Sequence, residues 1–127
     1  MNPETCLDVA SLEKLINIGG REFATKMIDL FLSYIPERLA EARAAVQAGD
    51  LVRVQRAVHP IKSSAANIGA QPLRDLAAHI EQLAIDQRGE SLAALLGELD
   101  AAYAQVKARL EQQRETLATL ENRVAGD

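Results

Sequence analysis

Of the two histidines in the chain, His59 stands where it could do chemistry at the protein surface. Around it, apolar residues recur at intervals of three and four, which predicts one helix with a buried stripe made of Leu51, Val54, Val58, Ile61, Ala65 and Ile68. Because an α-helix turns about 100° per residue, His59 lies about 130° from the centre of that stripe. We therefore expect its ring to face solvent, where neutral imidazole offers a nucleophilic nitrogen.

The neighbours of His59 are cationic. Arg56 precedes it by three positions and Lys62 follows it by three, so both are predicted to flank the ring on the same face. Between Val52 and Arg74 there is no Asp or Glu, and the basic residues are Arg53, Arg56, Lys62 and Arg74. In a chain with a formal net charge of −4, this segment predicts a cationic strip suited to a phosphoryl group or to a partner with an acidic pocket.

Phosphoryl transfer is the chemistry that these residues could support. Its transition state is loose, so positioning and charge neutralisation matter most, and Lys62 could neutralise phosphoryl oxygens. The small residues Ser63 and Ala66, on the same side, would let another protein approach the ring. The sequence has no glycine-rich phosphate loop, so the phosphoryl donor, any magnesium ion and the acceptor carboxylate are expected to come from a partner.

Composition narrows the class of protein. The 127 residues suit one domain, and 48% of them are hydrophobic although only 3% are aromatic, which favours helices built on Ala and Leu. The acidic balance argues against nucleic-acid binding. No apolar run reaches the roughly 20 residues that span a bilayer. The N-terminus lacks the pattern of a signal peptide, and Cys6 is the only cysteine, so we expect a soluble, cytoplasmic protein. We expect a monomer, although the sequence itself leaves the oligomeric state open.

Caps and breakers predict six helical segments. The first is short, from the N-cap Asp8 to Asn17, and Gly19–Gly20 closes it. The other five are Phe23–Ile35, Pro36–Val46, Leu51–Ile68, Pro72–Leu83 and Leu92–Leu120. Their boundaries are predicted from a helix end at Pro36 and from breaks at Gly49–Asp50, Gly69 and Gly89.

Four of these segments are substantial amphipathic helices joined by short loops. The predicted fold class is therefore all-α: an up-and-down four-helix bundle with a short additional N-terminal helix and a long C-terminal helix. We expect residues 1–127 to form a single domain, with a core at about 8–113 and a C-terminal helical extension at 114–127.

The segment Ala57–Ala70 (AVHPIKSSAANIGA) resembles the signature of the histidine-containing phosphotransfer (HPt) family. That signature is His, any residue, Leu, Lys, Gly or Ser, Ser, and then a Leu-Gly-Ala turn. The likeness covers roughly residues 8 to 110. It implies that His59 is the phosphoacceptor and Lys62 the lysine typical of the family. It also implies that Glu81, on the next helix, hydrogen-bonds the imidazole and sets its orientation and tautomer; the alternative is that Glu81 is an exposed helix carboxylate.

Two residues depart from the signature. Ser63 stands where many members have Gly, and Pro60 lies inside a helix, where proline removes a hydrogen bond. We expect crowding at Ser63 without loss of function. Pro60 is predicted to face solvent, where a mild kink is tolerable.

The resemblance implies a phosphoryl carrier without kinase or phosphatase activity of its own. His59 would accept a phosphoryl group from a receiver-domain aspartate of a hybrid histidine kinase and pass it to the receiver of a response regulator. No cofactor is expected on this chain, because magnesium would be bound by the receiver. The predicted partner-binding residues are Arg56, Ser63, Ala66, Gln55, Val52 and Ile16.

Two other hypotheses stay open. A metal-binding bundle would use His59, His79 and Glu81, but such bundles carry Glu-x-x-His pairs, and neither histidine has a Glu three residues before it. A non-catalytic helical adaptor, or coiled-coil interaction module, would use the heptad-like spacing of the last helix. Outside the metal hypothesis, His79 is expected to be a surface histidine and Cys6 to be incidental.

Overall fold

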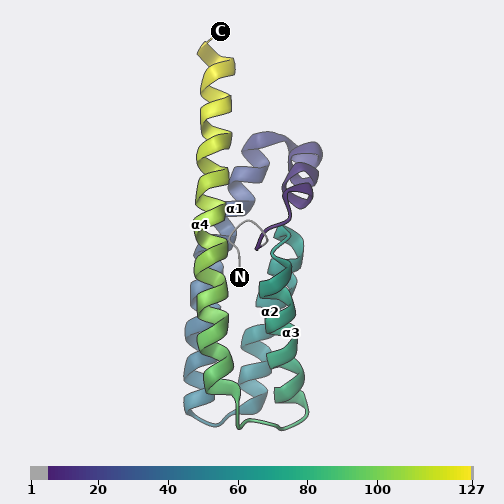
Figure 1. Cartoon of the computed structure of the whole chain (residues 1–127), viewed down its shortest axis with the longest axis vertical. Coiled ribbons are helices and arrows are strands. Elements are labelled where there is room, and N and C mark those ends of the chain that lie inside the picture. Colours follow the sequence, from purple (N-terminus) through teal and green to yellow (C-terminus); the bar gives the residue numbers. More distant parts are fainter. Residues whose placement is uncertain (1–5, 127) are drawn as a thin grey trace.

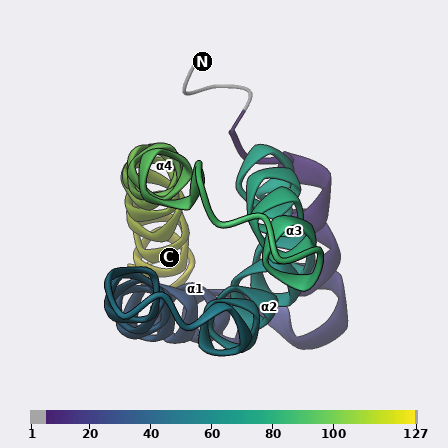
Figure 2. The same cartoon turned by 90° about the horizontal axis from the view of Figure 1, so that it is seen from below.

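The computed structural model describes the backbone of residues 6–126 and the side chains of residues 6–119. It contains the helices α1 (Val9–Gln47), α2 (Leu51–Ile68), α3 (Gln71–Ile85) and α4 (Leu92–Gly126). Neighbours in the chain pack together and α4 closes the ring against α1, so the helices stand at the corners of a square when viewed along the bundle (Figure 2). The predicted all-α up-and-down four-helix bundle is confirmed.

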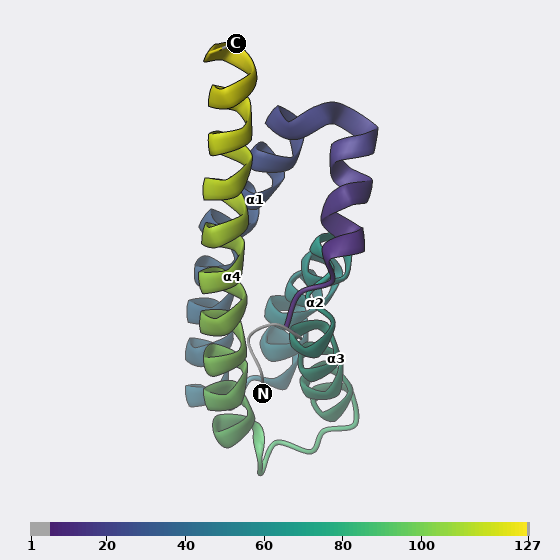
Figure 3. The same cartoon turned by 45° about the horizontal axis from the view of Figure 1, so that its top comes forward.

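The helix α1 bends at Gly20, which separates a short N-terminal segment from a long arm. Gly20 has φ 86° and ψ 178°, a combination that is essentially restricted to glycine because a Cβ atom would clash. Figure 3 shows the short segment (purple) lying beyond the end of α2. Asp8 caps it by accepting a hydrogen bond from the N–H of Ala10 at 3.0 Å. The predicted short helix, with its start at Asp8 and its end at the glycine pair, is therefore confirmed.

The long arm of α1 continues through Pro36, so the predicted helix end at this residue is wrong. Proline has no N–H, which leaves the carbonyl four residues earlier without a partner inside the helix. That carbonyl belongs to Leu32, and the hydroxyl of Tyr103 in α4 donates a hydrogen bond to it at 3.3 Å. Pro36 itself is exposed, and the buried stripe continues on both sides of it with Ile28, Phe31, Ile35, Leu39 and Ala42.

The helix α2 begins and ends where the sequence predicts. Asp50 accepts a hydrogen bond from the N–H of Arg53 at 3.1 Å, and Gly69 ends the helix with φ 85°. A Cβ atom on Gly69 would lie 2.5 Å from the Cβ of Ser11, so glycine is also needed for the close approach of the N-terminal segment. The N–H of Asp8 donates to the Gly69 carbonyl at 2.8 Å. These contacts fix both ends of the helix that carries His59.

The core runs along the bundle and consists mainly of aliphatic side chains. Every residue of the predicted α2 stripe is buried apart from Leu51, which is partly buried. Cys6 lies ahead of the first helix, as predicted, and is completely buried in this core. The short N-terminal segment brings this thiol into the bundle, because Asp8 is held at the end of α2.

The C-terminal helix α4 has 35 residues and extends beyond the other helices (Figure 1). It still contacts α1 near its C-terminal part, where the Nε of Arg114 lies 2.6 Å from Oδ1 of Asp29 and where Leu117 is buried. The long last helix is therefore confirmed. The division into a core ending near residue 113 and an extension from 114 stays a prediction.

Candidate functional site

His59 projects from the middle of α2, and 54% of its side chain is exposed. Its immediate neighbour Val58 and the residue two places on, Ile61, are fully buried. The predicted direction of the ring, away from the apolar stripe, is therefore confirmed. Because α2 is capped at both ends and packed against α1 and α3, the ring is presented on a fixed support.

A buried carboxylate of α3, Glu81, lies beside the ring. Its side chain is only 7% exposed, and it is the one charged residue that is buried within the described part of the chain. One oxygen, Oε2, lies 2.7 Å from Nδ1 of His59 and accepts a hydrogen bond from Nε2 of Gln55 at 2.9 Å. The other, Oε1, accepts from Nζ of Lys62 at 2.5 Å. We call these four residues the Glu81 cluster.

The hydrogen bonds of the Glu81 cluster keep its carboxylate ionised. Burial by itself would raise the pKa of Glu81, but the hydrogen bonds from Lys62, Gln55 and His59 outweigh it and hold the pKa below its ordinary value of 4.5. An ionised carboxylate can only accept hydrogen bonds. The hydrogen on Nδ1 of His59 must therefore point to Glu81, and in the neutral ring the lone pair is on Nε2, away from Glu81.

Lys62 is part of this arrangement. Its side chain is 30% exposed, and its ammonium group is bound to Glu81. The sequence placed Lys62 one turn after His59; the structure adds that its charge is held by the same carboxylate that holds the ring. A flexible four-carbon stem allows the ammonium group to move toward an anion that arrives at His59.

The cationic strip predicted around His59 is largely paired with acids from other parts of the structure. Arg53 contacts Glu41 of α1 at 3.0 Å, and Arg74 contacts Asp75, its own neighbour in the sequence, at 2.9 Å. Among the side chains described, Arg56 has no carboxylate within 4 Å. The strip is therefore less free of acids than its sequence suggests, because a stretch of sequence without acids does not exclude acids from adjacent segments.

Four of the predicted partner-binding residues lie exposed on α2: Arg56, Ser63, Ala66 and Val52, the last with 58% of its surface exposed. Helical geometry puts all four within about 60° of His59 around the helix axis. Ile16 is half-buried on the short N-terminal segment, and Gln55 is half-buried and bonded to Glu81. The structure thus brings five of the six residues together around the ring, four of them on the exposed face of α2 and Gln55 on the side that faces Glu81.

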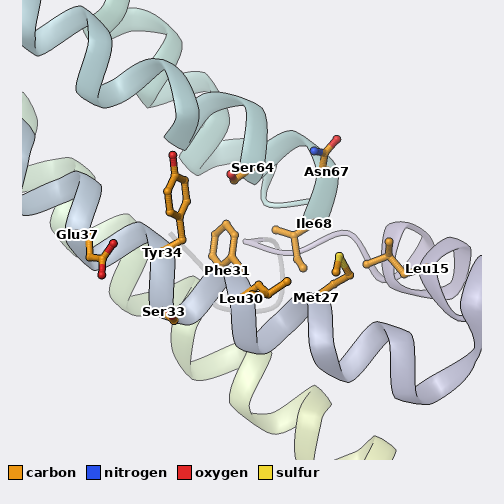
Figure 4. A pocket seen from close by; sticks show the side chains of 10 residues that line it. All are labelled: Leu15, Met27, Leu30, Phe31, Ser33, Tyr34, Glu37, Ser64, Asn67 and Ile68. Carbon is orange, nitrogen blue, oxygen red and sulfur yellow. The ribbon is translucent and has the colours of Figure 1, made fainter.

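The sequence analysis missed an apolar groove between α1 and α2, with a volume of about 360 Å³. Figure 4 shows Met27, Leu30 and Phe31 of α1 opposite Ile68 of α2 in this groove. Leu30 and Tyr34 are unusually exposed for apolar and aromatic residues, at 52% and 40%. Their spacing of four residues, off the buried stripe of α1, was the signal that could have revealed a second apolar face.

The other candidate ligands do not join the site. His79 is exposed, as predicted for a surface histidine. Within the described side chains, no group of three or more His, Cys, Asp or Glu residues lies close enough to hold a metal ion. The metal hypothesis therefore lacks the cluster that it requires. In the same part of the chain, no helix combines the length and apolar character needed to cross a membrane.

Residues 26–122 match the family model of the Hpt domain. The chain belongs to the Hpt domain family. This confirms the resemblance inferred from the segment around His59, although the match starts after the short N-terminal segment and extends further along α4 than expected. Membership assigns the chain a phosphotransfer role in a phosphorelay, the role in which members of this family interact with receiver domains.

Two solved structures are similar to this Hpt protein. Histidine-containing phosphotransfer protein B (HptB) from Pseudomonas aeruginosa PAO1 superposes with a TM-score of 0.84 at 26% identity, over 87% of this chain and 96% of that one. ZmHP2, a histidine-containing phosphotransfer protein from maize, gives a TM-score of 0.79 at 22% identity, over 94% and 90% of the two chains, and supports the fold alone. No curated protein sequence has a significant match to the chain.

Proposed function

We propose that His59 accepts a phosphoryl group on Nε2 from the phospho-aspartate of a hybrid histidine kinase receiver and passes it to the receiver of a response regulator. One observation supports this most strongly: Nδ1 of an exposed imidazole is held by a buried, ionised carboxylate. The nitrogen that remains nucleophilic is then the one available to a partner. The chain acts as a carrier and has no kinase or phosphatase activity of its own.

The transfer step is a displacement at phosphorus, and no atom changes its oxidation state. The lone pair of Nε2 attacks phosphorus, the N–P bond forms, and the P–O bond to the aspartyl carboxylate breaks, so that the aspartate leaves with the electron pair. The imidazole ring gains positive charge while its Nδ1–H stays hydrogen-bonded to Glu81. The negative charge of Glu81 stabilises that developing charge, and Lys62 neutralises phosphoryl oxygens. We assign the magnesium ion of this reaction to the receiver domain.

The receiver is proposed to cover the exposed face of α2. Ser63 and Ala66 are small enough for a close approach to the ring. Arg56, which has no carboxylate within 4 Å among the described side chains, offers its charge to the acidic pocket of a receiver. Val52 supplies an exposed apolar contact about two turns before the ring. Ile16 is assigned to the rim of the surface. The apolar groove between α1 and α2 lies at the edge of this surface.

Phosphotransfer from a labelled receiver domain tests the proposal. A receiver phosphorylated with ³²P is mixed with the wild-type protein, His59→Gln and His79→Gln. The wild type and His79→Gln should take up label at the same rate, because His79 is a surface residue outside the Glu81 cluster, whereas His59→Gln should take up none. Equal labelling of the wild type and His59→Gln would contradict the proposed function.

A non-catalytic helical adaptor is the second candidate, favoured by the C-terminal end of α4 that extends beyond the other helices (Figure 1). The adaptor function predicts that truncation after Gln113 abolishes partner binding and any oligomer. The carrier function predicts that the truncated chain still accepts the phosphoryl group. Because Leu117 is buried, the truncated chain has to be compared with the wild type by circular dichroism before its transfer rate is measured.

A further inference from the structure

Gln55 lies one helical turn before His59 on α2, and its amide binds the same carboxylate as the ring. Its Nε2 donates to Oε2 of Glu81 at 2.9 Å, and this oxygen lies 2.7 Å from Nδ1 of His59. Gln55, His59 and Lys62 stand at positions i, i+4 and i+7, which form one row along a helix. The whole row faces α3, which is why three side chains reach one carboxylate.

The donors are divided unequally between the two oxygens of Glu81. Oε1 accepts a hydrogen bond from the ammonium group of Lys62, whereas Oε2 accepts hydrogen bonds from both His59 and Gln55. A carboxylate oxygen has two lone pairs, so the two lone pairs of Oε2 are both in use. Without Gln55, the contact between Oε2 and the ring would depend on Lys62 to keep the carboxylate from rotating.

Lys62 cannot hold Glu81 and neutralise an incoming phosphoryl group equally well. Its side chain is 30% exposed, so it can move outward, and when it does Oε1 loses its donor. Gln55 carries no charge and has no electrostatic reason to follow the phosphoryl group. Its bond to Oε2 is therefore the contact that persists during transfer.

We propose that Gln55 is a positioning residue: it keeps Oε2 of Glu81 against Nδ1 of His59 while Lys62 turns to the phosphoryl group. This inference rests on the proposed function of His59. It differs from the sequence-based prediction of Gln55 as a partner contact, and the two roles have different kinetic signatures. A positioning residue changes the maximal rate of transfer, whereas a partner contact changes the receiver concentration that gives half of that rate.

The test variant is Gln55→Met, which keeps the length of the side chain and removes the amide. Gln82→Met is the matched control, because Nε2 of Gln82 donates to Oδ1 of Asp86 at 3.1 Å on the exposed surface of α3. Both variants lose one amide–carboxylate hydrogen bond, but only the first lies in the Glu81 cluster. Thermal melts establish that both are folded, and Gln55→Glu serves as a second variant of the same length.

The first measurement needs no partner: ¹⁵N NMR of the two ring nitrogens of His59 at a pH where the ring is neutral. The wild type and Gln82→Met should give the Nδ1-protonated tautomer. Gln55→Met should give ring shifts averaged between the two tautomers, because the carboxylate is no longer fixed. An unchanged tautomer in Gln55→Met and Gln55→Glu would overturn the proposal.

The second measurement is transfer from a phosphorylated receiver at increasing receiver concentration. In Gln55→Met the maximal rate should fall by about threefold to tenfold, as for loss of one typical intramolecular hydrogen bond, with half-saturation within about twofold of the wild type. A raised half-saturation with an unchanged maximal rate would make Gln55 a partner contact and overturn the proposal. If the wild type takes up no label, the proposed function of His59 fails, and the NMR spectra alone decide whether Gln55 positions the ring.

Discussion

The two halves of the bundle use polar contacts in different ways. Between α2 and α3, one carboxylate that is 7% exposed receives three hydrogen bonds. Between α1 and α4, the ion pair of Arg43 with Asp100 is 51% and 40% exposed, and a neutral hydrogen bond from Tyr103 completes a carbonyl freed by Pro36. Charges that are removed from water are costly to leave unpaired, whereas exposed pairs are worth little. The buried, paired carboxylate thus lies in the α2–α3 half, where the proposed function places the chemistry, and the α1–α4 half has, among the described side chains, only exposed or neutral polar contacts of this kind.

The largest effect is expected from Glu81→Leu. It leaves Nδ1 of His59, Nε2 of Gln55 and Nζ of Lys62 without their shared acceptor, so the ring loses its fixed tautomer. Transfer from a phosphorylated receiver should slow by about tenfold to a hundredfold, as when carboxylates that orient metal-bound histidines are removed. Asp86→Leu, on the exposed end of α3, is the control and should transfer normally. A normal rate in Glu81→Leu would remove the chemical distinction between the two halves.

Acid should weaken the α2–α3 half in particular. The pKa of Glu81 is lower in the folded protein than its ordinary value of 4.5, so the unfolded chain binds the proton first as the pH falls. The contribution of Glu81 to stability is therefore complete above about pH 4.5 and is lost as the pH falls through the folded-state pKa. Urea melts between pH 7 and pH 3 should show a smaller loss of stability for Glu81→Gln than for the wild type. Parallel curves for the two proteins would contradict this.

Tyr103→Phe is expected to have an intermediate effect, on stability alone. The Leu32 carbonyl already has no donor within the helix, because Pro36 has no N–H, and the substitution removes the hydroxyl of Tyr103 as well. The free energy of unfolding should fall by about 1 kcal/mol. Tyr34→Phe is the control, because Tyr34 is 40% exposed at the surface. Denaturant melts should separate the two variants while their transfer rates stay equal. Equal stability of the two variants would mean that the Tyr103 hydrogen bond does not support α1 at Pro36.

The smallest effect is expected at the exposed pair of Arg43 and Asp100, although two hydrogen bonds of 3.0 and 2.9 Å join them. A double-mutant cycle with Arg43→Ala and Asp100→Ala should give a coupling free energy below about 1 kcal/mol, because solvent screens both charges. A coupling free energy above this limit would show that an exposed ion pair contributes as much as a buried one, which contradicts the comparison of the two halves.

Much of the fold follows from local signals in the sequence. Asp8, Asp50 and Gly69 act as the caps that their types predict, and the stripe of α2 fixes the direction of His59. The sequence predicts a helix end at Pro36, but the helix continues, because the carbonyl that Pro36 leaves without a partner is bound by Tyr103, which lies 67 positions after Pro36 in the chain. A contact between distant residues leaves no trace in the local periodicity from which helices are read.

In the candidate site, too, local features could be predicted and contacts between helices could not. The position of His59 could be predicted from helical geometry, and the place of Glu81 beside it was implied by the family resemblance. Three pairings could not be predicted, because each joins side chains from different helices: Lys62 with Glu81, Arg53 with Glu41 and Gln55 with Glu81. The angular position of a residue on its helix gives the direction of its side chain, whereas its hydrogen-bond or ion-pair partner depends on which helix packs alongside.

The central claim is that phosphorus is bound to Nε2 of His59 while Nδ1 keeps its hydrogen bond to Glu81. The most direct measurement is ¹⁵N and ³¹P NMR of the protein after phosphorylation by a receiver domain. We predict one-bond coupling of phosphorus to Nε2 of His59 and a proton on Nδ1. Phosphorus on Nδ1, or on any residue other than His59, would contradict this account.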